Sequence, residues 1–249
     1  MKAPIITDVT DRVLSITWNY PERLNALSTT MLSAAAEAIE TAPDDVRVIV
    51  IRGAGRAFSS GGDVRKLDVE TIEAGHRLVR AIARARFPVI AGVNGPAVGI
   101  GCSIAVAADL TLAKRSSYFL MPFVSLGLMP DGGSTQLLAA SIGRARALGM
   151  VMLGERLSAD DAEKSGLIYR SVADDSFDYE LRLLVSKVRN GPTLALAATK
   201  KAIAATTLSH LDEALDREST TQLNLLETSD GRSGRRAFLE KTKAEFEGQ

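Results

Sequence analysis

An apolar run that ends in a glycine-rich turn, residues 87–103, constrains this chain more than any other feature. Residues 87–93 are apolar and include β-branched side chains, which is typical of a buried strand. Residues 94–103 (NGPAVGIGCS) then turn sharply and lead into a helix that we predict to continue over 104–108. A strand, a tight turn and a helix N-terminus leave backbone N–H groups unpaired and pointing one way, which suits a developing negative charge. The stretch is also compatible with a packing turn, so it does not identify a function by itself.

The apolar pattern predicts an α/β fold in which strands alternate with helices up to about residue 175. Predicted strands cover 13–19, 46–51, 87–93 and 110–113, with a short extended piece at 119–122. Predicted helices cover 28–40, 72–86, 136–141, 144–153 and 158–166, and Ser28 and Ser158 are expected N-caps. Strand signals then stop, and further helices are predicted at 177–189, 193–206, 211–227 and 235–246. The chain therefore divides into an α/β core, 1–175, and a C-terminal helical region, 176–249, whose apolar faces need a core or a neighbouring subunit.

Composition excludes several classes of protein. The 249 residues include 30 basic and 30 acidic side chains, a balance that argues against nucleic-acid or membrane-surface binding. Residues 89–110 are largely apolar, but Asn94, Pro96 and Asp109 interrupt them, so we predict no membrane span. A single cysteine excludes an internal disulfide and fits a reducing compartment. Because residues 1–10 also lack signal-peptide features, we expect a cytoplasmic protein.

Metal, hydrolase and nucleotide sites find little support. The two histidines, His76 and His210, lie far apart on helical patterns, where we expect ordinary surface or helix residues and no metal site. Residues 101–105 lack the last glycine of a nucleophile elbow. The glycines at 99 and 101 come too late for a dinucleotide-binding loop and have no third partner, and no phosphate-binding loop signature is present.

Four motifs identify a known family. Residues 21–27 (PERLNAL) resemble P-x-x-x-N-A-L, and residues 57–63 (AFSSGGD) resemble A-F-S-x-G-x-D. Residues 94–102 resemble N-G-x-A-x-G-x-G-x, and residues 127–136 (GLMPDGGSTQ) resemble G-x-x-P-x-x-G-x-T-Q. Any one motif is weak, but four in the right order and spacing are specific. The chain thus resembles the crotonase superfamily, the enoyl-CoA hydratase/isomerase family, over nearly its whole length.

The resemblance implies an α/β fold built as a crotonase-like ββα spiral, followed by a C-terminal helical region that mediates trimer contacts. A homotrimer or a dimer of trimers is therefore expected. The implied substrate is an acyl-CoA thioester, with coenzyme A as part of the substrate and no separate cofactor. The family's shared device is an oxyanion hole of two backbone N–H groups, which by position fall on Gly62 and Ile100. Such a donor contributes about 10²–10³ in rate because it is aimed where charge develops.

The expected acids differ from those of the family's hydratases. Those enzymes carry two glutamates, and the matching positions here hold Ser103 and Phe123, which cannot replace carboxylates in activating water. One carboxylate remains in a place appropriate to the family, Asp131, which resembles the acid/base of certain bacterial isomerase-like members. Asp131 is also compatible with a turn residue that caps the following helix.

The resemblance also implies a coenzyme A path along the loops around 23–26 and 57–65 and a C-terminal segment that reaches it. The residues expected to contact substrate or coenzyme A are Arg23, Leu24, Ala26, Ala57, Ser60, Asp63, Val64, Arg65, Phe238 and Lys241.

Taken together, the residues favour a Δ3-Δ2-enoyl-CoA isomerase that stabilises a thioester enolate and uses Asp131 as its acid/base. An enoyl-CoA hydratase with atypical acids and a non-catalytic acyl-CoA binding protein remain alternatives. Nothing in the sequence specifies the length or branching of the acyl chain.

Overall fold

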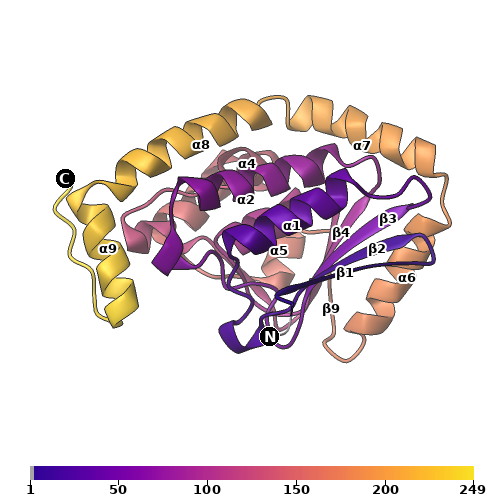
Figure 1. Ribbon diagram of the computed structural model, residues 1–249, viewed down its shortest axis with the longest axis horizontal. Coiled ribbons are helices and arrows are strands. Elements are labelled where there is room, and N and C mark those ends of the chain that lie inside the picture. Colours follow the sequence, from indigo (N-terminus) through magenta and orange to yellow (C-terminus); the bar gives the residue numbers. More distant parts are fainter. Residues whose placement is uncertain (1–2) are drawn as a thin grey trace.

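The computed structural model describes residues 3–249, which are organised around two β-sheets, and the larger sheet is seen in Figure 1. In the larger sheet the strand order is β1-β2-β3-β4-β6-β9, where β1 is antiparallel to β2 and all other neighbours are parallel. Its strands are β1 (Ile5–Thr10), β2 (Val13–Trp18), β3 (Val48–Gly53), β4 (Val89–Val93), β6 (Leu110–Lys114) and β9 (Arg170–Val172). The smaller sheet has the order β5-β7-β8, with β5 (Ala97–Val98), β7 (Tyr118–Leu120) and β8 (Leu157–Ser158).

A helix follows the strands in each turn of the spiral. The α-helices are α1 (Thr29–Glu40), α2 (Val69–Arg84), α3 (Ile100–Ala107), α4 (Ser134–Leu153), α5 (Ala159–Ser165), α6 (Phe177–Arg189), α7 (Thr193–Thr207), α8 (Leu211–Leu226) and α9 (Ser229–Glu240). Three short 3-10 helices are η1 (Pro21–Arg23), η2 (Val64–Lys66) and η3 (Pro122–Leu126). The chain passes from a strand of the large sheet to a strand of the small sheet and then to a helix, first through β4-β5-α3 and again through β6-β7-α4. A bridge between Ser59 and Ala97 adds the preceding turn to the small sheet, and the predicted ββα spiral is confirmed.

Burial on both faces explains the apolar strands. Ile49 and Ile51 of β3 belong to the main core with α1 and α2, whereas Val48 lies in a second cluster with Phe177 and Leu181 of α6. Successive side chains point to opposite faces, so a strand covered on both faces must be apolar throughout. The sheet is therefore a rigid base for the loops at its edge.

The predicted caps are confirmed, since the Ser28 hydroxyl accepts the Met31 N–H and the Ser158 hydroxyl accepts the Asp161 N–H. The break predicted between 141 and 144 is also present, because Gly143 has φ 76° and ψ 159° inside α4.

Several predicted boundaries were wrong. The last helix begins at Ser229, not at 235, because Gly231 and Gly234 are poor helix formers in isolation yet allow α9 to approach the backbone of Leu225 and Leu126. The helix predicted to continue over 104–108 is α3, which begins within the glycine-rich turn at Ile100 and ends at Ala107. The strands β1 and β9 were not predicted.

Of the C-terminal helices, α7 and α8 run along one side of the spiral, whereas α6 lies at one end beside the large sheet and α9 lies at the other end (Figure 1). α8 packs against α2 and α4, and α9 packs against η3 and η2. α7 has no buried residue, although its sequence is rich in alanine and leucine. Within residues 3–249, no helix combines the length and hydropathy needed to cross a bilayer.

Candidate active site

A cavity of about 530 Å³ lies where η1, the loop 60–65, α2, the start of α3, η3 and α9 meet. Most of the residues predicted for the site share this cavity. They are Arg23, Ala26, Ser60, Gly62, Asp63, Val64, Arg65, Ile100, Asp131, Phe238 and Lys241. The spiral therefore brings segments more than 200 residues apart in sequence to one place, because the chain returns to the same edge with each turn.

Leu24 and Ala57, two of the residues expected to contact coenzyme A, are not among those that line the cavity, and their backbone groups hold its wall together. Leu24 adopts the left-handed conformation with φ 52°, and its carbonyl accepts the Ser60 N–H at 2.9 Å. The Ala57 carbonyl accepts the amide Nδ2 of the buried Asn25 at 2.8 Å. Both residues join the first two motifs through their backbone carbonyls, and these hydrogen bonds support the cavity wall.

Two backbone N–H groups on the cavity wall remain free. The N–H groups on either side of Gly62 are engaged, since Gly61 donates to the Ser59 hydroxyl and Asp63 to the Leu27 carbonyl. The Gly62 and Ile100 N–H groups themselves donate to nothing within residues 3–249. A Cβ built on Gly62 would lie 3.9 Å from Ile100 Cγ2, so the two turns are adjacent. This arrangement suits an oxyanion.

The sharp turn before Ile100 depends on Gly99. This residue has φ 53° and ψ −129°, which a side chain would strain. Because α3 begins directly after it, the Ile100 N–H is the first of the helix and has no partner in the preceding turn.

Asp131 is the carboxyl group in the apolar part of the cavity. It is 5% exposed, its Oδ2 accepts the Gln222 amide at 3.3 Å, and its Oδ1 has no hydrogen-bond partner among the described residues. Burial in the first place, and the nearby Glu218 carboxylate in the second, raise the pKa of Asp131 to about 7. Gly132 follows it, and a Cβ there would meet Ile100 Cδ1 at 2.4 Å. The Asp131 loop therefore abuts the residue that supplies one of the free N–H groups.

Ser103 and Phe123 bring no further carboxyl group to the cavity. The fully buried Ser103 hydroxyl donates to the Asp131 carbonyl at 2.8 Å and so holds the loop. Phe123 lines the cavity, and its ring lies 3.7 Å from where a Cβ of Gly99 would be. Ser103 thus supports the Asp131 loop, and Phe123 forms part of the cavity wall.

Comparisons with known proteins identify the family of the chain. A family model described as enoyl-CoA hydratase/isomerase matches residues 8–249. The chain belongs to the enoyl-CoA hydratase/isomerase family. It is 36% identical to the 1,2-epoxyphenylacetyl-CoA isomerase of Escherichia coli (98% of each chain) and 34% identical to the 2,3-dehydroadipyl-CoA hydratase of the same organism (98% of this chain and 99% of the other). Its fold matches the crystal structure of an enoyl-CoA hydratase from Mycobacterium avium subsp. paratuberculosis with a TM-score of 0.94 and 41% identity, over 98% of this chain and 99% of the other.

Charged groups gather at the open side of this family member's cavity. Arg65 forms a bidentate ion pair with Asp63, which lowers the pKa of that carboxyl. Exposed Arg23 and Lys241 and the 57% exposed Phe238 line the same cavity. An exposed aromatic ring beside cations can bind a ligand that carries both a planar ring and phosphates. Within the described chain, no cluster of three or more His, Cys, Asp or Glu residues could hold a metal ion.

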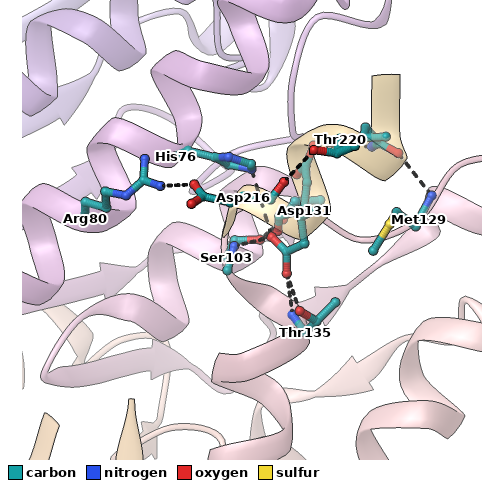
Figure 2. A network of polar contacts seen from close by, with 12 residues as sticks. His76, Arg80, Ser103, Met129, Asp131, Thr135, Asp216 and Thr220 are labelled. Carbon is teal, nitrogen blue, oxygen red and sulfur yellow. Dashed lines mark hydrogen bonds and ion pairs between the residues drawn. The ribbon is translucent and has the colours of Figure 1, made fainter. Parts of the chain in front are cut away.

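The sequence interpretation missed the polar residues behind Asp131. Glu218 is 0% exposed, and its carboxylate accepts the Gly133 N–H at 2.6 Å, the Thr135 N–H at 2.9 Å and the Thr135 hydroxyl at 2.5 Å. Figure 2 shows Asp131 beside α8, with Ser103 and Met129 on either side. The missed signal was an acidic residue within an apolar face, since Leu211 and Leu215 precede Glu218 at helical spacing and are buried.

His76, expected to be a surface or helix residue, lies on the helix α2 and is buried. It is 3% exposed, and burial lowers its pKa to about 4, so the ring is neutral at physiological pH. Its Nε2 lies 4.0 Å from Glu218 Oε2, too far for a hydrogen bond.

Proposed function

We propose that this acyl-CoA enzyme is a Δ3-Δ2-enoyl-CoA isomerase in which Asp131 is the acid/base. The observation that carries the proposal is a buried carboxyl with a pKa of about 7 in the cavity that also holds two free N–H groups. An ordinary aspartate, with a pKa of 3.8, is a weak base at neutral pH, whereas a group that titrates near neutrality both accepts and returns a proton readily.

The reaction needs one base and one oxyanion site. With the thioester oxygen held by the Gly62 and Ile100 N–H groups, the Asp131 carboxylate removes a proton from C2. The electron pair of the broken C–H bond moves into the thioester, and the oxygen becomes negative. The protonated Asp131 then delivers the proton to C4, the C3–C4 double bond is lost and a C2–C3 double bond forms. The reaction consumes no water or oxidant and needs no second carboxyl group. This fits a cavity in which Ser103 and Phe123 stand where a hydratase has its two glutamates.

Two alternatives predict different activities. A hydratase needs a carboxylate to activate water and a group to protonate carbon, and the hydratase among the relatives keeps this alternative open. A non-catalytic protein would bind acyl-CoA in the same cavity without turnover. The name of the Escherichia coli isomerase adds 1,2-epoxyphenylacetyl-CoA to the substrates worth testing.

We also propose that coenzyme A enters as part of the substrate along Arg23, Arg65, Phe238 and Lys241, and that no separate cofactor takes part. The exposed apolar side chains of α7, such as the 88% exposed Leu194, support assembly as a trimer or a dimer of trimers. A cytoplasmic location is part of the same proposal.

The deciding experiment compares wild type, Asp131→Asn and Asp212→Asn on 3-enoyl-CoA, 2-enoyl-CoA and 1,2-epoxyphenylacetyl-CoA. Asn keeps the size of Asp131 but cannot accept a proton, so isomerisation should fall at least about 10²-fold while acyl-CoA binding stays near wild type. Asp212 lies on the surface of α8 in ion pairs with Arg80 and Arg84, so its variant controls for loss of a carboxylate. Brisk hydration by wild type and Asp131→Asn alike would refute the isomerase assignment. Binding without turnover on any substrate would establish the binding-protein alternative.

A further inference from the structure

Two residues of α8 hold the loop that carries Asp131. Glu218 and Gln222 are four residues apart, so they lie one above the other on the same face of the helix. Both are 0% exposed although they are polar. Gln222 forms hydrogen bonds with Met129 and with Asp131 itself, and Glu218 forms one with Gly133, two residues after Asp131. One face of α8 therefore forms hydrogen bonds with the loop on both sides of Asp131, the proposed acid/base.

Glu218 acts as the missing cap of α4. Gly133 precedes that helix and has no side chain to cap it, so the first N–H groups of α4 need an acceptor from elsewhere. The Glu218 carboxylate accepts the N–H groups of Gly133 and Thr135 and the Thr135 hydroxyl. These donors stabilise the charged form against the burial that raises the Glu218 pKa. The result is a buried carboxylate fixed close behind Asp131.

Gln222 has a defined orientation. Its Oε1 accepts the Met129 N–H at 3.1 Å, which leaves Nε2 to donate to Asp131 Oδ2 at 3.3 Å. A donor to a carboxylate favours the ionised form, so Gln222 acts on Asp131 in the opposite sense to the Glu218 charge.

Charged or titratable groups on the elements that surround Asp131 include His76 and Arg80 on α2, Asp216 and Arg217 on α8, Cys102 on α3, and Arg23, Asp63, Arg65 and Lys241 along the cavity. His76 is neutral, as is Cys102, because burial raises its thiol pKa to about 12. Arg80 is paired with Asp212 and Asp216. η3 and the first turn of α4 contain no titratable side chain. Glu218 is therefore the charge that acts on Asp131 from behind.

We propose that Glu218 and Gln222 are positioning residues for Asp131, which hold its loop from both sides and act on its carboxyl as a neighbouring negative charge and as a hydrogen-bond donor, respectively. The inference rests on the proposed function, since it assigns these residues to an acid/base at Asp131. Neither residue lines the cavity, so both act through Asp131 and not on the substrate.

The test is the direction in which two variants move the titration of Asp131. Glu218→Gln removes the negative charge, so the Asp131 pKa should fall by about one unit. Gln222→Met keeps the volume but removes the donor, so the Asp131 pKa should rise by about half a unit or more. The acid limb of the pH–rate profile on 3-enoyl-CoA should shift by the same amounts. Asp212→Asn is the matched control, because it removes a carboxylate from the exposed face of the same helix and should move neither value.

A second readout does not depend on activity. The Asp131 carboxyl signal can be assigned by comparing ¹³C NMR spectra of aspartate-labelled wild type and Asp131→Asn, and its titration can be followed in each variant. Shifts of opposite sign support the inference. Shifts of the same sign, or none, overturn it, because a merely structural role would not separate the two variants. Should Glu218→Gln not fold, a Gln222→Met titration at or below the wild-type value overturns it alone. Failure of the proposed function would instead appear as full activity of Asp131→Asn.

Discussion

The raised pKa of Asp131 predicts that the wild-type residue destabilises the protein above neutral pH. The folded pKa of about 7 lies above the ordinary value of 3.8, so the folded state binds the Asp131 proton more tightly than the unfolded state does. The free energy of unfolding therefore falls as the pH rises from about 4 to about 7 and stays low above that range. A shift of about three units corresponds to about 4 kcal/mol, of which about 2.5 kcal/mol should accrue between about pH 5 and pH 8.

Asp131→Asn isolates this effect because Asn cannot ionise and can accept the same Gln222 hydrogen bond. The variant should gain about 2.5 kcal/mol relative to wild type between about pH 5 and pH 8. Urea unfolding at several pH values and a fixed protomer concentration measures this difference, provided that the m-values agree. Asp212→Asn, which lacks an exposed carboxylate, should show no comparable trend.

A constant difference between Asp131→Asn and wild type across this pH range would refute the reasoning. It would mean that Asp131 titrates alike in the folded and unfolded states. The carboxyl would then be an ordinary weak base, and the physical basis for its role in isomerisation would be lost. A difference in the free energy of unfolding that grows by about 2.5 kcal/mol between about pH 5 and pH 8 would show that the ionised Asp131 destabilises the enzyme. Residues that lower stability are often found at active sites.

Three further predictions concern the cavity and the assembly. Gly62→Pro removes one N–H and should lower turnover by about 10²-fold with an unchanged circular dichroism spectrum; unaltered turnover in a folded variant would exclude this donor. Gly132→Ala should lower both the melting temperature and turnover, because Gly132 has φ 67° and a Cβ would meet Ile100; a wild-type melting temperature would contradict this close packing of the loop. Light scattering should give a mass of at least three chains, and Leu194→Glu should reduce it; a wild-type monomer would refute the assembly.

Much of the fold follows from local sequence. The strands β3 and β4 are continuous apolar runs, and Ser28 and Ser158 mark helix starts by hydrogen bonds that span only three residues. Such signals depend on residues that are close together in sequence, so they can be recognised without knowledge of the fold. The edge strand β1 was missed because it is mostly exposed and forms by pairing with β2 without a buried apolar face. The glycine-containing start of α9 was missed because its close approach to Leu126 of η3 depends on a segment distant in sequence.

The site was predictable in part for a related reason. The glycine-rich turns around Gly62 and Ile100 and the Asp131 loop carry motifs that are continuous in sequence, and these stretches meet in one cavity. Leu24 and Ala57 lie in the same motifs but are not among the residues that line the cavity, since a motif does not reveal which of its side chains reach a cavity.

The sequence by itself determined the class of fold, the family and the stretches that form the cavity, because each depends on residues close together in the chain. Only the tertiary structure decided the environment of Asp131. Glu218 and Gln222 lie 87 and 91 residues away in sequence and approach it only because α8 folds back over α2 and α4. Burial and a neighbouring charge are properties of three-dimensional packing, and they turn an ordinary aspartate into a group that titrates near neutrality.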